Sequence, residues 1–266
     1  MITTARVPFL DLNAVNAPLR ESLDLALKTV LTHGVFVGGP EVALFESEFA
    51  AYCDARACVG VANGTDSLEL ILAGLGIRPG DEVIVPGNTF VATAEAVCAV
   101  GARPKFVDVH PDTLLLDADA AAAAVSTRTA AIIAVHIYGQ MADMPRLAAI
   151  AARHGLALIE DAAQAHGAPA RCLPVANHPD AESVYHLAVV MVDDPTAVMR
   201  DLDQAGIGWG RHYPVPCNQQ PAFADYAVGL PVVDAAAKRI ISLPMSPMLT
   251  AGQISYVCAA LKSRAR

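Results

Sequence analysis

Short apolar runs alternate with segments of helical periodicity between residues 57 and 168. Four runs have the length and composition of buried strands, at 82–85, 105–108, 130–137 and 156–160. Four segments with apolar residues at helical spacing lie at 66–75, 91–100, 117–125 and 145–154. Strands that alternate with helices of about ten residues are typical of βαβ units. The pattern therefore predicts an α/β fold with a mostly parallel sheet covered by helices on both faces.

The pattern changes after residue 183. Strands are expected at 185–192 and 207–213, and helices at 194–204, 234–241 and 250–262. Thr250 and Gln253 form a capping box at the start of the last helix, and Asp66 is expected to cap the helix that begins near residue 66. This part predicts a small C-terminal α+β domain. The segment 166–180 between the two patterns is rich in Pro, Ala and polar residues and is typical of a linker.

Composition excludes several classes of protein. Of 266 residues, 54% are hydrophobic and 17% charged, which favours a large buried core over disorder. The net charge of −9 offers no basic stripe for nucleic acid, and no run of about 18 apolar residues predicts a membrane span. The N-terminus lacks an apolar signal region, and the six cysteines form no CxxC pair, so we expect a cytoplasmic protein with free thiols and no metal site.

Polar residues follow the predicted strands. In a parallel sheet, ligands bind beyond the carboxyl ends of the strands, so 86–90, 136–140 and 161–166 are expected on one rim. Gly64 and Thr65 precede a helix, which suits a phosphate, although an ordinary helix cap has the same pattern. Phe90 is suited either to stacking on a planar ring or to the core.

The segment 160–167 places two acids, an amide and an imidazole at the end of an apolar strand. A carboxylate there can hold a ring nitrogen protonated. Metal binding by Asp161 and His166 lacks a third ligand at convincing spacing. The sequence contains no G-x-S-x-G, G-x-G-x-x-G or Walker A motif, which argues against those hydrolase, dinucleotide and P-loop sites. In the C-terminal part, His212 and Tyr213 stand beside a proline turn, as a substrate contact or as part of a rigid loop.

Taken together, these segments resemble the DegT/DnrJ/EryC1/StrS family of sugar aminotransferases, fold-type I enzymes that use pyridoxal 5'-phosphate. The stretches that carry the resemblance are VPFLDL, GVFVGGPEVALFESEFAAYC, VANGTDSLELILAGLGIRPGDEVIVPGNTFVATAEAV, GARPKFVDVHPDTLLLD, VHIYGQMADM, HGLALIEDAAQAHGA and AGIGWGRHYPVPCNQQPAF. The resemblance implies that Gly64 and Thr65 hold the cofactor phosphate and that Phe90 stacks on its ring. It also implies that Asp161 binds the pyridine nitrogen and that Gln164 contacts the ring hydroxyl.

The same resemblance implies a substrate and a partner. The substrate is a nucleotide-linked keto-sugar, the amino donor is an amino acid, and His212 and Tyr213 lie near the substrate. Relatives of this kind form homodimers with shared active sites.

One part of the family pattern is missing from the sequence. In the family, the segment that follows EDAAQAHGA leads to a further strand and then to the lysine that forms a Schiff base with the cofactor. Here the chain passes directly from Ala168 into C-terminal sequence, and a block of about 100 residues, the size of a small domain, is absent. None of the four lysines, Lys28, Lys105, Lys238 and Lys262, lies in a matching context.

The predicted organisation is therefore an incomplete large domain (1–168), a deletion junction (169–182) and a small C-terminal domain (183–266). The catalytic residue is unknown, and three interpretations stay open. The first is that the chain is a non-catalytic pseudoenzyme, and we favour it for the isolated polypeptide. The second is that it is an aminotransferase whose missing segment another chain supplies. The third is that it is an interaction module that pairs with a full-length relative.

Overall fold

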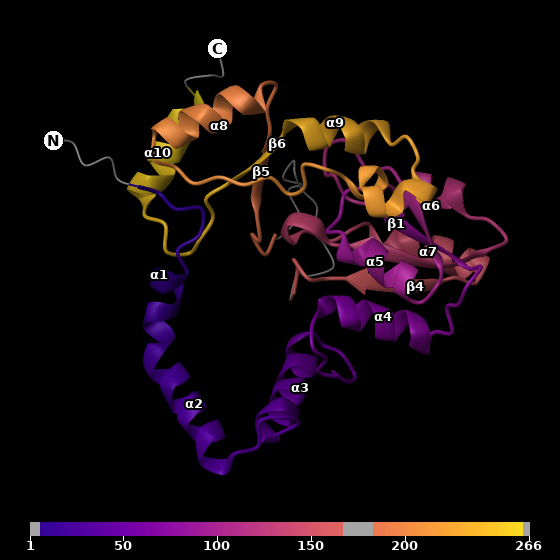
Figure 1. Ribbon diagram of the computed structural model, residues 1–266, viewed down its shortest axis with the longest axis horizontal. Helices are drawn as coiled ribbons and strands as arrows, with labels where there is room; N and C mark the ends of the chain where they lie inside the picture. Colours follow the sequence, from indigo (N-terminus) through magenta and orange to yellow (C-terminus); the bar gives the residue numbers. More distant parts are fainter. Residues whose placement is uncertain (1–5, 167–182, 263–266) are drawn as a thin grey trace. The chain divides into compact units, whose positions relative to one another are not determined.

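The computed structural model describes residues 6–166 and 183–262 (Figure 1). By their internal contacts the residues group into two compact units, each described here by itself. The first unit comprises Met1–Val61, Arg200–Trp209 and Pro244–Arg266, and the second Ala62–Met199 and Gly210–Leu243. The boundaries of these units differ from those of the predicted domains, 1–168 and 183–266. The predicted junction, 169–182, lies outside the described residues.

A four-stranded parallel sheet forms the centre of the second unit, in the order β2-β1-β3-β4. The strands are β1 (Glu82–Pro86), β2 (Arg103–Val107), β3 (Thr129–Val135) and β4 (Ala157–Asp161). Each overlaps a strand that the sequence predicts, so the predicted parallel α/β architecture is confirmed. Among the described residues β4 pairs on one side, with β3, and ends the sheet.

Helices cover both faces of this sheet because alternate strand residues point to opposite sides. Val83 and Val85 pack in one buried cluster with residues of α4 (Gly64–Gly74), α5 (Ala92–Ala99) and α9 (Pro231–Arg239). Ile84, between them, packs in a second cluster with residues of α6 (Ala118–Ala124) and α7 (Met144–His154). The alternation along β1 thus explains the layers visible in Figure 1.

Two predictions for the second unit were wrong. Helix α4 begins at Gly64 and its cap is Asn63, whose side chain accepts the Asp66 amide; Asp66 itself lies in the first turn. The segment 240–243 forms strand β6 (Ile240–Leu243), antiparallel to β5 (Ala188–Met191), where the sequence suggested the end of a helix. Two buried isoleucines, which are β-branched, and a buried leucine favour a strand there over another helical turn.

The first unit contains α1 (Leu12–Asn16), η1 (Ala17–Leu19), α2 (Arg20–His33), α3 (Pro40–Tyr52) and α10 (Ala251–Lys262). Helix α8 (Pro195–Gln204) spans the boundary, and three short 3₁₀ segments lie in the second unit: η2 (Ile137–Gly139), η3 (Cys217–Gln219) and η4 (Pro221–Tyr226). The capping box of α10 is confirmed: the Thr250 amide donates to Gln253 Oε1 at 2.9 Å, and the Gln253 amide donates to Thr250 Oγ1 at 3.2 Å. Within the described ranges, no helix is long and apolar enough to cross a membrane.

The strand expected at 207–213 is reduced to two isolated bridges. In the first unit Val7 pairs with Ile207, and in the second Gly210 pairs with Ser242. A side chain at Gly208 would place its Cβ 2.4 Å from the backbone nitrogen of Phe9, so the close approach of these two segments requires glycine.

Asp108 caps helix α9 from the end of strand β2. Its carboxylate accepts the amides of Val232 and Val233, both at 2.9 Å, while the N-cap residue Leu230 has no side chain suited to the task. A carboxylate at a helix N-terminus satisfies amides that the helix leaves unpaired and interacts favourably with the helix dipole. This contact fixes α9 against the same sheet edge that carries the polar residues described below.

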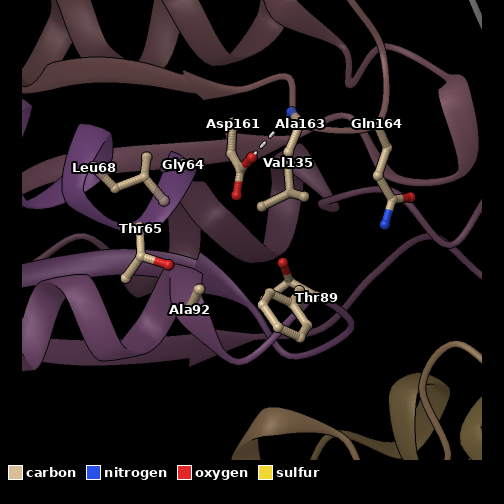
Figure 2. Close-up of a pocket in the computed structure, with 10 residues that line it drawn as sticks. Gly64, Thr65, Leu68, Thr89, Ala92, Val135, Asp161, Ala163 and Gln164 are labelled. Atoms are coloured by element: carbon tan, nitrogen blue, oxygen red, sulfur yellow. Dashed lines mark hydrogen bonds between the residues drawn. The ribbon is translucent and has the colours of Figure 1, made fainter. Parts of the chain in front are cut away.

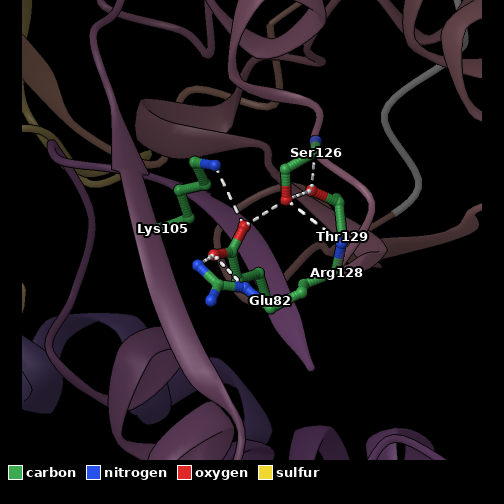
Figure 3. Close-up of polar contacts among 5 residues, drawn as sticks. All are labelled: Glu82, Lys105, Ser126, Arg128 and Thr129. Carbon is green, nitrogen blue, oxygen red and sulfur yellow. Dashed lines mark hydrogen bonds and ion pairs between the residues drawn. The ribbon is translucent and has the colours of Figure 1, made fainter. Parts of the chain in front are cut away.

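Glu82 ties three segments together at the opposite edge of the sheet (Figure 3). Its side chain is 8% exposed and accepts from Lys105 Nζ at 2.9 Å on β2, from Ser126 Oγ at 2.6 Å and from Arg128 Nε at 3.0 Å before β3. Burial alone raises the pKa of Glu82, but the hydrogen bonds from Ser126, Lys105 and Arg128 outweigh it and lower that pKa to about 2.

Because its folded pKa lies below the ordinary value of 4.5, Glu82 stabilises the fold above about pH 4.5, and this contribution is lost as the pH falls toward 2. We expect E82Q to lower the free energy of unfolding at pH 7 by about 2–3 kcal/mol and to flatten its pH dependence between pH 5 and 2. Urea unfolding across that range measures both effects. The matched control is D119N, which breaks an exposed ion pair with Arg146 and should cost about 1 kcal/mol or less. Equal losses in the two variants would contradict the role given to Glu82.

Candidate functional site

A pocket of about 240 Å³ opens at the carboxyl edge of the sheet (Figure 2). Its walls come from the start of α4, the loop between β1 and α5, the last residue of β3, and the end of β4 with the turn that follows. The lining residues are Gly64, Thr65, Leu68, Thr89, Phe90, Ala92, Val135, Asp161, Ala163 and Gln164. All five residues that the sequence analysis assigned to a cofactor thus line one pocket.

The N-terminus of α4 forms one end of this pocket. Asn63 Oδ1 accepts the Asp66 amide at 2.9 Å, so the cap satisfies one of the first amides of the helix. The amides of Gly64 and Thr65 have no partner within the helix, because the first turn of any helix leaves its N–H groups unpaired. A Cβ at Gly64 would meet no atom within 4 Å, so glycine leaves this end of the pocket open. Open amides and a helix dipole make an anion site.

Asp161 stands at the end of β4 with each carboxylate oxygen held by one donor. The Thr93 hydroxyl donates to Oδ2 at 2.9 Å. The Ala163 amide donates to Oδ1 at 3.2 Å (Figure 2). Thr93 is fully buried, and its oxygen lies 2.9 Å from the hydroxyl oxygen of Thr89. A half-buried carboxylate fixed in this way can keep a ring nitrogen protonated when that nitrogen faces it.

Phe90 and Tyr213 lie next to each other at the side of the pocket, with ring centroids 5.7 Å apart. Phe90 is 53% exposed, so its ring belongs to the pocket wall and not to the core. Gln164 lies between Tyr213 and the sheet: its Nε2 donates to the Tyr213 hydroxyl at 3.3 Å, and its Oε1 accepts the Tyr138 amide at 2.7 Å. Desolvation by burial is the main cause that raises the pKa of Tyr213, which keeps its hydroxyl neutral.

Tyr138 connects these residues, and the sequence analysis did not single it out. It is 1% exposed and has a φ of 62°, a left-handed conformation that a non-glycine residue rarely adopts. Its hydroxyl donates to the His212 carbonyl at 2.6 Å and accepts from Asn88 Nδ2 at 3.3 Å. Burial raises the pKa of Tyr138, so it acts as a neutral donor. A signal was present in the sequence, since Tyr138 follows the strand that ends at the rim.

His212 points its ring toward β6, where Nδ1 lies 2.8 Å from Ser242 Oγ. Burial lowers the pKa of His212, which favours the neutral imidazole. The other rim histidine, His136, is buried between the Ala142 amide, which donates to Nδ1, and the Glu160 carboxylate, 2.9 Å from Nε2. These contacts give His136 a structural role. In the described residues, no group of three His, Cys, Asp or Glu side chains is arranged to hold a metal ion.

The lysines lie elsewhere. Lys105 is bound to Glu82 at the opposite edge of the sheet, Lys238 is exposed on α9, and Lys28 is exposed on α2 in the other unit. Lys262, at the end of α10, also belongs to that other unit. The pocket described here is lined by no lysine.

The chain is similar to known proteins over most of its length. The chain matches the DegT/DnrJ/EryC1/StrS aminotransferase family over residues 19–178 and again over 170–262. It is 32% identical to the UDP-2-acetamido-2-deoxy-3-oxo-D-glucuronate aminotransferase of Pseudomonas aeruginosa, with 96% of this chain and 99% of the relative covered. It is 33% identical to the dTDP-3-amino-3,4,6-trideoxy-alpha-D-glucose transaminase of Streptomyces venezuelae, with coverages of 97% and 96%.

Solved structures show the same relationship. The crystal structure of S. venezuelae DesV in complex with a ketimine intermediate matches with a TM-score of 0.93 at 32% identity, over 98% of this chain and 99% of that one. A DegT/DnrJ/EryC1/StrS aminotransferase from Brucella abortus matches with a TM-score of 0.88 at 26% identity, over 97% and 99%. The family match spans more than half of the chain, and the fold agrees over nearly all of it. This chain belongs to the DegT/DnrJ/EryC1/StrS aminotransferase family.

Proposed function

We propose that the pocket binds pyridoxal 5'-phosphate or pyridoxamine 5'-phosphate, the cofactor forms that aminotransferases of this family use. The observation that carries the proposal is that an anion site, an aromatic ring, an amide and a fixed carboxylate converge in one pocket. Gly64 and Thr65 are suited to the phosphate, Phe90 to the ring face, Asp161 to the pyridine nitrogen and Gln164 to the ring hydroxyl.

The bound cofactor supplies an electron sink for the transfer of an amino group. In our proposal Asp161 keeps the pyridine nitrogen protonated, which that chemistry requires, and the Thr93 and Ala163 donors keep the carboxylate in place. Phe90 covers one face of the ring and excludes water from it. Tyr213, held by Gln164, and His212, held by Ser242, stand toward the substrate side.

The described pocket has no group that carries a proton to and from the substrate carbon. In aminotransferases a lysine amine does this and also anchors the cofactor, and positioned acid–base groups contribute about 10²–10⁴-fold to the rate. The alignments with the P. aeruginosa and S. venezuelae relatives run over 356 and 365 positions, against a chain of 266 residues, so about 100 positions of each relative face a gap. The two family matches meet at 170–178. We infer that a segment with the lysine is missing at that junction.

We therefore propose that the isolated chain is a pseudoenzyme that retains the cofactor pocket. The names of the relatives support a nucleotide-linked keto-sugar, with an amino acid as donor, as the substrate class of the lineage. The alternative is an aminotransferase completed by another chain that supplies the missing segment.

We also propose that the protein is cytoplasmic, and the free thiols among the described cysteines support this.

We expect pyridoxal 5'-phosphate to bind without a covalent link to the chain. After incubation with the cofactor and reduction with borohydride, intact-mass spectrometry should show the unmodified mass of 27.7 kDa. Equilibrium dialysis of pyridoxamine 5'-phosphate, which cannot form the link, should show binding by the same preparation.

The positive control is the full-length S. venezuelae relative under the same conditions. A stoichiometric mass increase on one lysine of this chain would contradict the absence of a covalent link. Failure to bind pyridoxamine 5'-phosphate would contradict the cofactor pocket itself.

Helix α2 supports the proposal that the chain pairs with a second copy of itself. None of its 14 residues is buried. Its apolar side chains are exposed as well: each of four leucines is at least half exposed, namely Leu23, Leu25, Leu27 and Leu31. A helix of this length is marginal in water without packing on an apolar face. Phe36 and Val37, in the following turn, are 69% and 90% exposed and extend the apolar surface. Exposed apolar surface of this extent is typical of an interface between proteins.

We expect the chain to sediment as a dimer and the L23E/L27E double variant to sediment as a monomer of 27.7 kDa. The reason is that both leucines lie on one face of α2, four residues apart, where a charge cannot be buried without a large penalty. The matched control is S22E, which adds charge on the same exposed helix away from that face. Sedimentation velocity over a range of concentrations measures the result. A monomeric wild-type chain, or a dimer that persists in L23E/L27E, would contradict pairing through α2.

A further inference from the structure

The carboxylate of Asp161 is held by a chain of two hydroxyl groups. Thr93 Oγ1 lies 2.9 Å from Asp161 Oδ2 and 2.9 Å from Thr89 Oγ1. An ionised carboxylate only accepts hydrogen bonds, so the single hydroxyl hydrogen of Thr93 is used on Asp161. Thr89 must then donate to Thr93. The direction of both hydrogen bonds is fixed by this reasoning, from Thr89 through Thr93 to Asp161.

Burial makes this arrangement rigid. Thr93 is fully buried and Thr89 is 2% exposed, so water does not compete for either hydroxyl. Thr93 lies in the first turn of α5, which packs on α4 and on the sheet, and Thr89 lies in the loop before α5, whereas Asp161 ends β4. The second donor to Asp161, the Ala163 amide, comes from the turn after β4. Two donors from different elements, one on each oxygen, set the plane of the carboxylate.

We propose that Thr93, backed by Thr89, is a positioning residue that orients the Asp161 carboxylate toward the ring nitrogen of a bound pyridine. This inference rests on the proposed cofactor pocket. Thr93 does not line the pocket. It would act on a bound ligand only through Asp161. Without the Thr93 donor, only the Ala163 amide holds the carboxylate, on one oxygen, and part of the cost of ordering Asp161 must come from the binding energy of the ligand.

The test compares T93V, which keeps the shape and removes the donor, with T93S, which keeps the donor. Each is measured by calorimetry with pyridoxamine 5'-phosphate and with its analogue in which a carbon replaces the ring nitrogen. We expect T93V to weaken binding of pyridoxamine 5'-phosphate about tenfold, because hydrogen bonds to charged groups are worth at least that much. T93S should bind within about twofold of the wild type, and affinity for the carbon analogue should be the same in all three proteins, since it offers Asp161 no ring N–H.

T89V provides a second measurement if T93V does not fold. It removes the donor behind Thr93 and should weaken binding of pyridoxamine 5'-phosphate about threefold, with the carbon analogue unaffected. Wild-type affinity for pyridoxamine 5'-phosphate in both valine variants would overturn the inference and leave the cofactor pocket standing. Equal weakening for both ligands would overturn it as well, because it would show a merely structural role. A wild-type chain that binds neither ligand would overturn the proposed function together with this inference.

Discussion

The parallel pairing of β1, β3 and β4 is the constraint on which the site depends. Parallel strands end at the same edge of the sheet, and the register places Val135 of β3 opposite Asp161 of β4. Residues far apart in the chain, such as Phe90 after β1 and Gln164 after β4, therefore line one pocket with Asp161. At the other edge Glu82 binds side chains from β2 and from the segment before β3, and so holds the amino ends of the strands in register.

This constraint also shows what the chain lacks. Strand β4 carries Asp161 and pairs on one side only within the described residues, which leaves the backbone groups of alternate residues on its outer side without a strand partner. A strand at the edge of a sheet is less protected than one inside it and offers itself to another chain. Asp161 is nevertheless held by Thr93 and Ala163, which do not depend on a further strand. The contacts that orient the carboxylate therefore do not require a strand on the outer side of β4.

The sequence predicted the parts of the structure that depend on periodicity and on strand ends. The four strands and the common rim of Phe90, Asp161 and Gln164 followed from apolar runs and the geometry of parallel sheets. It did not predict α2 and α3: none of the residues of α2 is buried, and in α3 only Ala50 is, so the burial that supports such a prediction is almost absent. It also missed Thr93, because a threonine in a helical segment gives no sign of the carboxylate 68 residues away that it will contact. Such contacts depend on which helices and strands pack side by side, and the pattern of residues in a single sequence does not show this.

Binding and catalysis are separable in this architecture because they use different parts of the chain. The groups suited to the cofactor come from α4, the β1–α5 loop and the end of β4, all before residue 167. In our proposal the proton-carrying lysine belongs to a segment that this chain lacks, since the alignments with the relatives are about 100 positions longer than the chain. Loss of such a segment would remove the covalent anchor and the acid–base group together, but it would leave the Thr89, Thr93 and Asp161 contacts intact. Under that proposal, the pocket can bind a cofactor without transamination, since the hydrogen bonds that hold Asp161 come from Thr93 and Ala163, within the part of the chain that remains.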